Sequence, residues 1–362
     1  MSEIVLKKIS YGQLQENTWL TGNDCYGMAA FVDENVRNTF LQSPNNNQPD
    51  KTAILLALDG DVIVGRHLLY GTTIKTGQGN IMAQSSGSTE VHESQRGKGI
   101  GSKINKWTLN NDEYPVYICS LLSPACLRIM EKKENACTIF EFPELVKIIN
   151  MEAAFACRGM KGVPLKICKG LCNLFLGIFN IPTKVKVSKL KKKYSLKKEK
   201  DIPEWAGDMC MNDGHKYAEV HDNAWLRWNL NYNLTGKLQD KQSFYSIYKG
   251  EKPVGFFFTK ERLRDDVSSE MIIGTLCEWA SVDKELTETD INLLAYSTFN
   301  KKCYYMRTVT NSPKSCNNMK EYWFRKHGEM QMGFKDKLSQ YSDMTEQSNW
   351  RIRFGCCNSI LF

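Results

Sequence analysis

Three glycines at alternate positions lie between a predicted strand and a predicted amphipathic helix, in the segment Arg96-Gly-Lys-Gly-Ile-Gly101. The strand covers residues 80–91, and the helix has Ile100, Ile104 and Trp107 on one face. Glycines that follow a strand expose successive backbone N–H groups at the N-terminus of the next helix, and this geometry binds phosphate. The order of strand, glycine loop and helix therefore indicates an α/β fold with a phosphate site.

The spacing of the glycines excludes two common nucleotide-binding motifs. A dinucleotide fingerprint needs G-x-G-x-x-G with an acidic residue about 20 positions later, and a P-loop needs G-x-x-x-x-G-K-[ST]. What remains resembles the pyrophosphate loop of the GNAT superfamily of acyl-CoA-dependent acyltransferases. Members commonly read V-h-P-E-Y-R-G-K-G-I-G, and Val91 to Gly101 read V-H-E-S-Q-R-G-K-G-I-G here, so that only the P-E-Y triplet departs.

The resemblance implies acetyl-CoA or another acyl-CoA as co-substrate. The backbone amides of the loop would hold the coenzyme A pyrophosphate, Val91 would hydrogen-bond the pantetheine arm, and Ser102 would cap the helix or contact phosphate. The expected cofactor-binding residues are Val91, Arg96, Gly97, Lys98, Gly99, Ile100, Gly101 and Ser102. A glycine-rich surface turn is the alternative interpretation of the same segment.

The reaction that the resemblance implies is attack of an amine on a thioester carbonyl, which needs a base, an oxyanion donor and an acid. Strand alternation predicts that Gln84, Ser86, Ser88, Glu90 and His92 share one face. Glu90 or His92 is therefore the predicted catalytic base, directly or through water. A surface carboxylate beside a loop is the alternative interpretation.

The sequence indicates the general acid less clearly than the base. In many family members a tyrosine on the later helix protonates the thiolate, and an alignment that starts that helix at Ser123 puts Met130 at the tyrosine position. By position, Tyr117 or Cys126 could substitute, and many members manage without a dedicated acid.

The order of predicted elements, β-β-β-α-β-α-β, occurs in both halves of the chain, which indicates a duplicated fold with mixed sheets. The predicted domains are 1–160, a GNAT-like acyl-CoA-binding domain; 161–200, an apolar helix and a lysine-rich connector; and 201–362, a degenerate GNAT-like domain. The second copy lacks the glycine loop, because Ser281–Thr287 at the equivalent point contains no glycine and three charged residues. One coenzyme site per chain is therefore expected.

Turn and cap signals set the ends of several of these elements. The turn Asp59-Gly-Asp61 predicts a hairpin, Ser123 before proline predicts a helix N-cap, and Thr287 with Asp290 predicts another. In the second half, we predict helices at 225–228, from 287 and near 317–326, and strands at 244–248, 253–259, 271–280, 303–309 and 329–334.

The whole excess of positive charge lies in one segment. The formal charge is +8, and Lys184–Lys200 alone contains nine lysines and one glutamate. The alternation of lysine and valine in Lys184–Val187 predicts an edge strand with a solvated lysine face. The alternative is a patch for anionic phosphates. Nucleic acid is not expected, because no arginine is interleaved with aromatic residues there.

Residues 151–182 are apolar and helical in character, with their densest apolar run at Leu171–Phe179. This run is too short to span a bilayer, so we expect it to pack between domains. A peripheral membrane contact through residues 171–200 is the alternative.

Thirteen cysteines are scattered along the chain without a CxxC pair or a Cys/His cluster of zinc-ligand spacing. We therefore expect reduced thiols and no metal site. No leader pattern occurs in Met1–Gly12, and a cytoplasmic protein is expected.

Together these patterns and the resemblance predict an acyl-CoA-dependent N-acyltransferase that transfers an acyl group, with acetyl as the expected one, to a primary amine of a small molecule such as an amino-sugar. The alternative is a non-catalytic GNAT-like protein that binds acyl-CoA or a partner protein. In the second half, Trp225 and Trp228 are expected in the core; alternatively, they line an acceptor cleft with Arg227 or Arg351.

Overall fold

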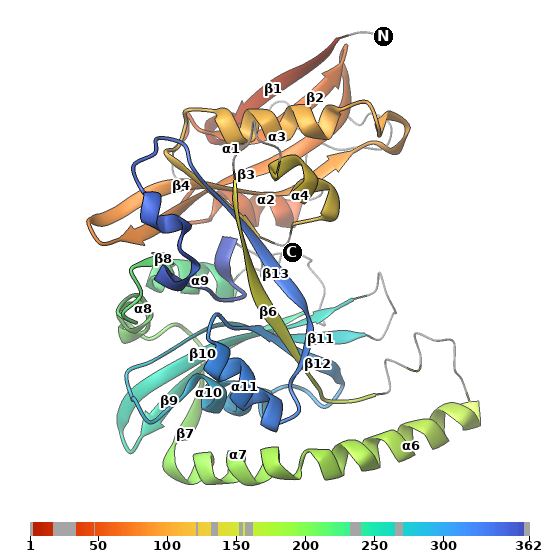
Figure 1. The fold of residues 1–362 in the computed structure, drawn as a ribbon, viewed down its shortest axis with the longest axis vertical. Coiled ribbons are helices and arrows are strands. Elements are labelled where there is room, and N and C mark those ends of the chain that lie inside the picture. Colours follow the sequence, from red (N-terminus) through yellow and green to blue (C-terminus); the bar gives the residue numbers. More distant parts are fainter. Residues whose placement is uncertain are drawn as a thin grey trace. The chain divides into compact units, whose positions relative to one another are not determined.

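The computed structural model in Figure 1 describes residues 3–16, 34–46, 48–120, 122–131, 137–151, 155, 162–231, 240–264 and 271–357. Contacts divide the chain into two compact units, and neither unit is continuous in the sequence. Unit 1 is Met1–Glu141, His215–Val220 and Gln331–Arg351, and unit 2 is Phe142–Gly214, His221–Met330 and Ile352–Phe362.

Unit 1 contains a mixed sheet with the strand order β1-β2-β3-β4-β5-β13. Neighbours from β1 to β4 are antiparallel, β5 is parallel to β4, and the C-terminal part of β13 is antiparallel to β5. Strand β8 pairs with both β3 and β14. The bounds are β1 Ile4–Ser10, β2 Thr52–Asp59, β3 Val62–Thr76, β4 Gly79–Val91, β5 Val116–Ser120, β8 Tyr217–Glu219, β13 Arg325–Asp336 and β14 Trp350–Arg351.

The helices of unit 1 follow the predicted pattern around the glycine loop. Ile100 and Ile104 are buried against Leu55 and Val64 of the sheet, so the predicted apolar face is confirmed. The predicted hairpin is also confirmed, since Gly60 has a φ of 63° in the β2–β3 turn. The bounds are α1 Tyr11–Glu16, α2 Glu34–Leu41, η1 Glu93–Gln95, α3 Ile100–Asn110, α4 Pro124–Met130, η2 Ser342–Thr345 and η3 Gln347–Asn349.

In unit 2 the strands follow the order β6-β12-β11-β10-β9-β7, again with both parallel and antiparallel neighbours. Strands β11 and β12 are parallel, and the other neighbours are antiparallel. The strands are β6 Thr138–Ile148, β7 Ser195–Glu199, β9 Lys241–Lys249, β10 Lys252–Leu263, β11 Ile272–Ser281 and β12 Cys303–Val309. The helices are α6 Gly162–Phe179, α7 Ile181–Lys193, α8 Trp205–Met211, α9 Asn223–Asn231, α10 Glu288–Tyr296 and α11 Pro313–Glu321.

Most predicted elements of the second half are confirmed, with two differences at its C-terminal end. Helix α11 begins at Pro313 and ends at Glu321, earlier than predicted, because the Ser312 side chain caps it by accepting the Ser315 amide at 3.2 Å. The last predicted strand is part of β13, and its residues Met332–Asp336 pair with β5 of unit 1. The predicted domain boundaries at residues 160 and 200 differ from the limits of the two contact units, and they stay predictions.

The predicted edge strand at Lys184–Val187 is wrong, because these residues lie in α7. Thr183, Val187 and Leu190 recur at helical spacing and are buried, and a proline occupies the first turn. Four alternating residues are too few to outweigh this apolar helical face, which packs against α10. A lysine-bearing edge strand does occur nearby, since β7 is the last strand of its sheet.

Candidate functional site

Strands β4 and β5 separate inside unit 1 after a short parallel ladder. The ladder joins Ala83 to Val116 and ends at the pair Ser85–Ile118. Just beyond its end lies a cavity of about 380 Å³, whose lining comes from β3, β4, β5, α3 and α4. Parallel strands that part in this way offer a slot in which an extended ligand can replace the missing strand partner.

A β-bulge in β4 redirects the side chains beside this cavity. Ser88 and Thr89 together lie opposite the single residue His67 of β3. Ser88 has a φ of 49°, which few residues with a side chain adopt. The extra residue reverses the alternation along the strand. Ser86 therefore lines the cavity before the bulge, whereas Thr89 and Val91 line it afterwards.

The predicted shared face of Ser86, Glu90 and His92 is wrong beyond the bulge, because one inserted residue turns every later side chain to the other face. Glu90 is half exposed and forms an ion pair with Arg66 at 2.6 Å. His92 is the N-cap of η1, where its ring accepts a hydrogen bond from the Ser94 amide at 3.4 Å. Both residues are described, and neither lines the cavity. Their catalytic role stays a prediction.

The glycine loop opens toward solvent at the N-terminus of α3. Gly97 and Gly99 have φ values of 83° and 78°, a region in which glycine alone is free of strain. A Cβ atom at Gly97, Gly99 or Gly101 would meet nothing within 4 Å. In the described part of the chain, no backbone acceptor contacts the amides of Gly97, Lys98 or Gly99. The first turn of α3 adds further free amides and the positive end of the helix dipole.

The other predicted cofactor residues lie around this loop. The carbonyl of Val91 accepts a hydrogen bond from the Arg96 guanidinium at 3.3 Å. Ile100 is buried in the core, so only its backbone can face a ligand, and Ser102 is half-buried in the first turn of α3. Because Val91 and Gly101 both line the cavity, the loop of free amides and the slot between the strands adjoin.

Tyr117 and Cys126, the two residues suggested by position as substitutes for the missing acid, both line the cavity. The Tyr117 hydroxyl lies 2.5 Å from the Ser86 hydroxyl. Burial holds the pKa of Tyr117 well above its usual range, so the phenol is protonated at neutral pH. Burial also raises the pKa of the Cys126 thiol to about 11. Met130 is buried and does not line the cavity.

His67 also lines the cavity, and no sequence pattern pointed to it. Its Nδ1 lies 2.6 Å from the Thr89 hydroxyl. When that hydroxyl donates, the ring proton sits on Nε2, which is buried and lacks a partner among the described residues. Burial lowers the pKa of His67 to about 4, so the ring is neutral at pH 7. A neutral imidazole with a free N–H can stabilise an oxyanion.

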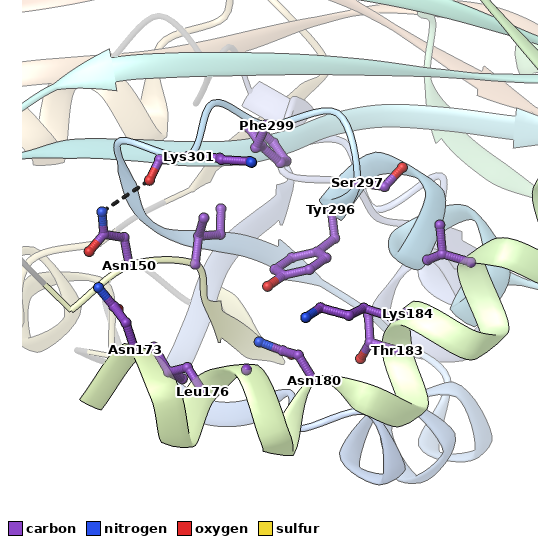
Figure 2. A pocket seen from close by; sticks show the side chains of 13 residues that line it. Asn150, Asn173, Leu176, Asn180, Thr183, Lys184, Tyr296, Ser297, Phe299 and Lys301 are labelled. Atoms are coloured by element: carbon purple, nitrogen blue, oxygen red, sulfur yellow. Dashed lines mark hydrogen bonds between the residues drawn. The ribbon is translucent and has the colours of Figure 1, made fainter. Parts of the chain in front are cut away.

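A second cavity, of about 540 Å³, lies in unit 2 beside α6 and α7. Figure 2 shows that Asn173, Asn180 and Lys184 from these helices and Tyr296 from α10 project toward it. No glycine loop adjoins this cavity in the described residues, and α10 is capped by its own side chains. The features that suit a diphosphate therefore belong to the cavity of unit 1.

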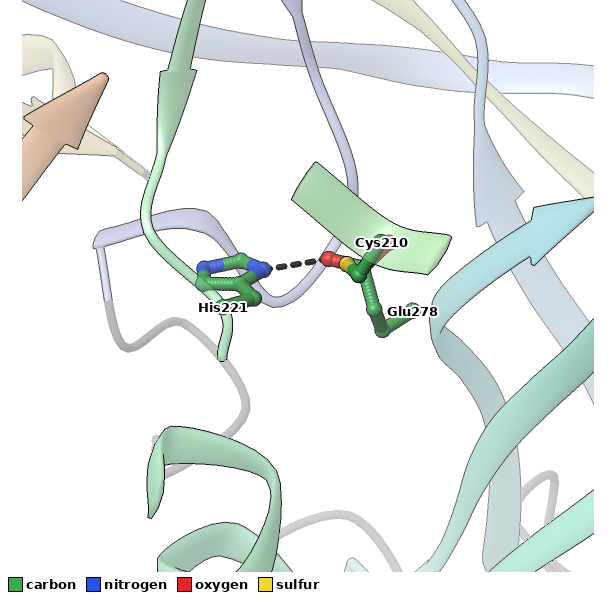
Figure 3. Close-up of side chains that lie close together, drawn as sticks. All are labelled: Cys210, His221 and Glu278. Atoms are coloured by element: carbon green, nitrogen blue, oxygen red, sulfur yellow. Dashed lines mark hydrogen bonds and ion pairs between the residues drawn. The ribbon is translucent and has the colours of Figure 1, made fainter. Parts of the chain in front are cut away.

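Three residues from distant parts of the sequence, Cys210, His221 and Glu278, lie together in unit 2 (Figure 3). They are buried, and their ligand atoms lie within 4.8 Å of one another, so they have the residue types and closeness of a metal site that sequence spacing did not suggest. The Glu278 carboxylate already contacts His221, accepts from the Trp279 amide at 2.9 Å and lies 3.5 Å from Arg353. These contacts compensate its charge without a metal.

Trp225 and Trp228 of the second half lie in the core, as expected. Trp225 stacks on His221 with 3.6 Å between the ring centroids, and both side chains are buried. Trp228 is buried as well. Arg227 forms ion pairs at the surface, and Arg351 is buried and donates to a backbone carbonyl at 3.0 Å. Buried tryptophans cannot stack on an acceptor, so the structure provides no cleft built from them.

No protein-family model and no curated protein matches the sequence. Among solved structures, a GCN5-related N-acetyltransferase from Anabaena variabilis is 10% identical, with a TM-score of 0.53 over 92% of this chain and 73% of that one. Saccharomyces cerevisiae N-myristoyltransferase with bound myristoyl-CoA is 12% identical, with a TM-score of 0.54 over 93% and 83%. A probable N-acyltransferase from Enterococcus faecalis is 11% identical, with a TM-score of 0.52 over 94% and 74%.

At such low identity these likenesses concern the fold alone. The chain has a mixed α/β fold that matches GNAT-like acyltransferases, and the predicted fold class is confirmed.

Proposed function

We propose that the protein is an acyl-CoA-dependent N-acyltransferase whose coenzyme site lies in unit 1. The observation that carries this proposal is the junction of two features: the free amides of the glycine loop and the cavity at the parting of β4 and β5. A diphosphate suits the first feature because backbone N–H groups and a helix N-terminus favour anions. An extended thioester arm suits the second.

In this arrangement, the amides from Gly97 to Gly101 hold the coenzyme pyrophosphate, the Arg96 side chain lies beside them, and Ser102 adds a hydroxyl at the helix start. Val91 lies where the loop meets the cavity, so its backbone suits the amide groups of the pantetheine arm. The arm then extends toward Ser86 and Tyr117, which face each other across the parted strands. The thioester carbonyl would lie within this part of the cavity.

The side chains in the cavity supply two of the three groups that the reaction needs. The amine nitrogen forms a bond to the thioester carbon, and the neutral His67 donates its Nε2–H to the developing oxyanion. The carbon–sulfur bond then breaks, and the Tyr117 hydroxyl, protonated because its pKa is high, delivers a proton to the leaving thiolate.

The base that accepts the ammonium proton of the acceptor remains Glu90 or His92, acting through water. The half-exposed Glu90 carboxylate and the surface position of His92 support contact with a solvent-borne amine. We propose acetyl as the acyl group and a primary amine of a small molecule, such as an amino-sugar, as the acceptor. We also propose that the two halves are tandem copies and that the protein is cytoplasmic.

A non-catalytic protein that binds acyl-CoA is the second candidate. The observation in its favour is the buried Met130 at the position where many relatives carry a tyrosine acid. Binding is common to both candidates, and turnover separates them.

The test is thiol release by the purified full-length chain from acetyl-CoA and from myristoyl-CoA, with amino-sugars, amino acids, polyamines and an N-terminal glycine peptide as acceptors. Acceptor-dependent release supports the enzyme, and the coenzyme that is consumed identifies the acyl class. Stoichiometric binding of acetyl-CoA without release from any acceptor supports the non-catalytic candidate. Failure to bind either coenzyme contradicts both.

A further inference from the structure

Helices α6 and α7 carry a continuous stripe of exposed apolar side chains in unit 2. Its members follow one another at intervals of three or four residues, so they lie on one face of the helix. They are Val163, Ile167, Leu171, Leu174, Ile178, Ile181 and Val185, and each is at least half exposed. Large apolar side chains that remain in water in such a row indicate a surface that is covered in use.

The two helices form one continuous rod. The amide of Asn180 donates to the Leu176 carbonyl and the amide of Lys184 donates to the Asn180 carbonyl, so helical hydrogen bonds continue across the junction. Figure 1 shows α6 and α7 as one extended element. The stripe spans 23 residues from Val163 to Val185, which corresponds to about 33 Å along the helix axis.

In α7, the face opposite the stripe is held by the rest of unit 2. Val187 and Leu190 of α7 belong to the core cluster that includes Ile291 and Leu294 of α10. Lys186 forms an ion pair with Asp290 at 2.8 Å. Because α7 is anchored in this way, it is fixed to the unit with its part of the stripe directed outward, and α6, none of whose apolar window is buried, continues from it.

Positive charge accompanies the stripe. Residues 162–198 contain ten lysines and no aspartate or glutamate. Three of these lysines, Lys189, Lys191 and Lys192, are exposed beyond the C-terminal end of the stripe and form no ion pair within the described part of the chain. An apolar stripe next to a lysine cluster is the pattern of a helix that lies in the interface of an anionic membrane.

By length and composition, α6 could also cross a membrane, since its 18 residues have a mean hydropathy of 1.4 and none of this window is buried. The helix is therefore longer than the apolar run that the sequence suggested. However, β6 precedes α6 and pairs with β12, which follows it, through contacts such as Ile148–Tyr305. A single crossing would put these paired strands on opposite sides of the bilayer. The topology thus favours a helix that lies along the surface.

We propose that α6 and α7 dock unit 2 onto an anionic lipid surface, with the apolar stripe inserted among the acyl chains and the exposed lysines at the headgroups. A second copy of the chain fits this face less well. Two such faces in contact would bring two lysine-rich segments together with no acidic residue between them, and like charges repel. Lipid headgroups such as phosphatidylglycerol supply the missing negative charge.

The experiment is cosedimentation of the full-length protein with vesicles of phosphatidylcholine alone or with about one third phosphatidylglycerol. Wild type should bind the anionic vesicles at least tenfold more strongly than the neutral ones, and high salt should weaken the binding. The variant Leu171→Ser/Leu174→Ser/Ile178→Ser should lose at least tenfold in binding, as should Lys189→Glu/Lys191→Glu/Lys192→Glu. All six side chains are exposed, so the fold is not at risk.

The matched control is Val5→Ser/Val282→Ser/Leu338→Ser, which removes three apolar side chains of similar exposure from other elements and should bind like wild type. Acetyl-CoA titration should be the same for all variants, which keeps this test separate from the coenzyme site. Unchanged vesicle binding by the stripe variant would overturn the proposal. So would equal binding to neutral vesicles, retention in the membrane after alkaline carbonate extraction, or a wild-type dimer that the stripe variant loses.

Discussion

Helix α3 of unit 1 and helix α10 of unit 2 each lie, along the chain, between two strands that pair in parallel, but their N-termini are opposite in chemistry. The N-cap of α3 is Gly99, which offers no side chain, so the first amides stay free. The N-cap of α10 is Thr287, whose hydroxyl accepts the Asp290 amide while the Asp290 carboxylate accepts the Thr287 amide. One helix start is open to an outside anion, and the other is already occupied by its own carboxylate.

The slots beside these helices differ in the same way. Strands β11 and β12 of unit 2 part after the pair Thr275–Arg307, where unit 1 has its cavity. In unit 2 the C-terminal segment lies against both strands: Gly355 donates its amide to the Cys277 carbonyl at 2.8 Å, and the Phe354 ring lies 4.3 Å from the Arg307 guanidinium. A fold with one element order can therefore carry an open site or a filled one, depending on a few residues at each opening.

The largest expected effect is the loss of acetyl-CoA affinity when the N-terminus of α3 is changed. Gly99→Asp places a carboxylate and a Cβ where the backbone must approach the pyrophosphate, so acetyl-CoA affinity should fall at least a thousandfold, or about 4 kcal/mol. Isothermal titration measures this loss, and thermal unfolding checks the fold. Gly250→Asp is the matched control, since Gly250 also has a positive φ and open space around it but lies in a turn of unit 2. Normal affinity in Gly99→Asp would contradict the site.

The filled slot of unit 2 should matter for stability and not for coenzyme binding. Phe354 is buried, so Phe354→Ala should lower the free energy of unfolding by about 3–4 kcal/mol, the cost of a cavity in a core. Urea unfolding measures this change. Acetyl-CoA should still bind once per chain, because the N-terminus of α10 is capped by its own Thr287 hydroxyl and Asp290 carboxylate. A stoichiometry of two in wild type or variant would show that unit 2 is a second coenzyme site.

The two units also differ in how they treat a buried histidine, since His67 is neutral in the cavity whereas His221 contacts a carboxylate. The folded-state pKa of His67 is about 4, below the unfolded value near 6.5, so the unfolded chain binds the extra proton between these pH values. The neutral His67 therefore contributes its full stabilisation above pH 6.5. As the pH drops to 4, the free energy of unfolding falls by about 3 kcal/mol.

His67→Gln should therefore flatten the loss of stability between pH 6.5 and 4, measured by urea unfolding at each pH. The control is His327→Gln at an exposed site, which should keep the wild-type slope. An unchanged slope in His67→Gln would mean that His67 is charged in the folded protein.

Within the open cavity, Tyr117→Phe removes the proposed acid and leaves the ring in place. We expect kcat to fall about 100-fold, the lower end of the usual range for losing a general acid, with little change in KM for acyl-CoA. The matched control is Tyr114→Phe, a buried tyrosine that does not line the cavity. Equal kcat in wild type and Tyr117→Phe would exclude the phenol as proton donor.

The smallest expected effect is on stability, when the capped N-terminus of α10 is changed. Asp290→Ala removes the reciprocal cap of α10 and the ion pair with Lys186, and it should cost about 1–2 kcal/mol of stability. Asp208→Ala, in the first turn of α8 without a capping bond, should cost less. The variant should not gain coenzyme binding, since the segment before α10 still lacks glycines. Binding of a second acetyl-CoA would show that the cap alone closes this site.

The local elements of the fold were readable from the sequence because local rules produce them. The glycine loop follows from positive φ at Gly97 and Gly99, and the caps at Ser123 and Thr287 follow from side chains that bond amides three residues later. The strands and helices on either side of the loop follow from the period of their apolar residues. These features depend on neighbours in the chain, so the sequence alone determines them.

The tertiary structure decided what depends on residues distant in sequence. The partner strand β3 reveals the bulge that turns Glu90 away from the cavity, and the same bulge pairs Thr89 with His67. The surface of α10 decides that Lys184–Val187 is helical, because burial of an apolar face outweighs a four-residue alternation. Likewise, β13 completes the sheet of unit 1 although it lies far along the chain. Strand pairing and burial join residues with no fixed spacing, and for this reason periodicity could not place them.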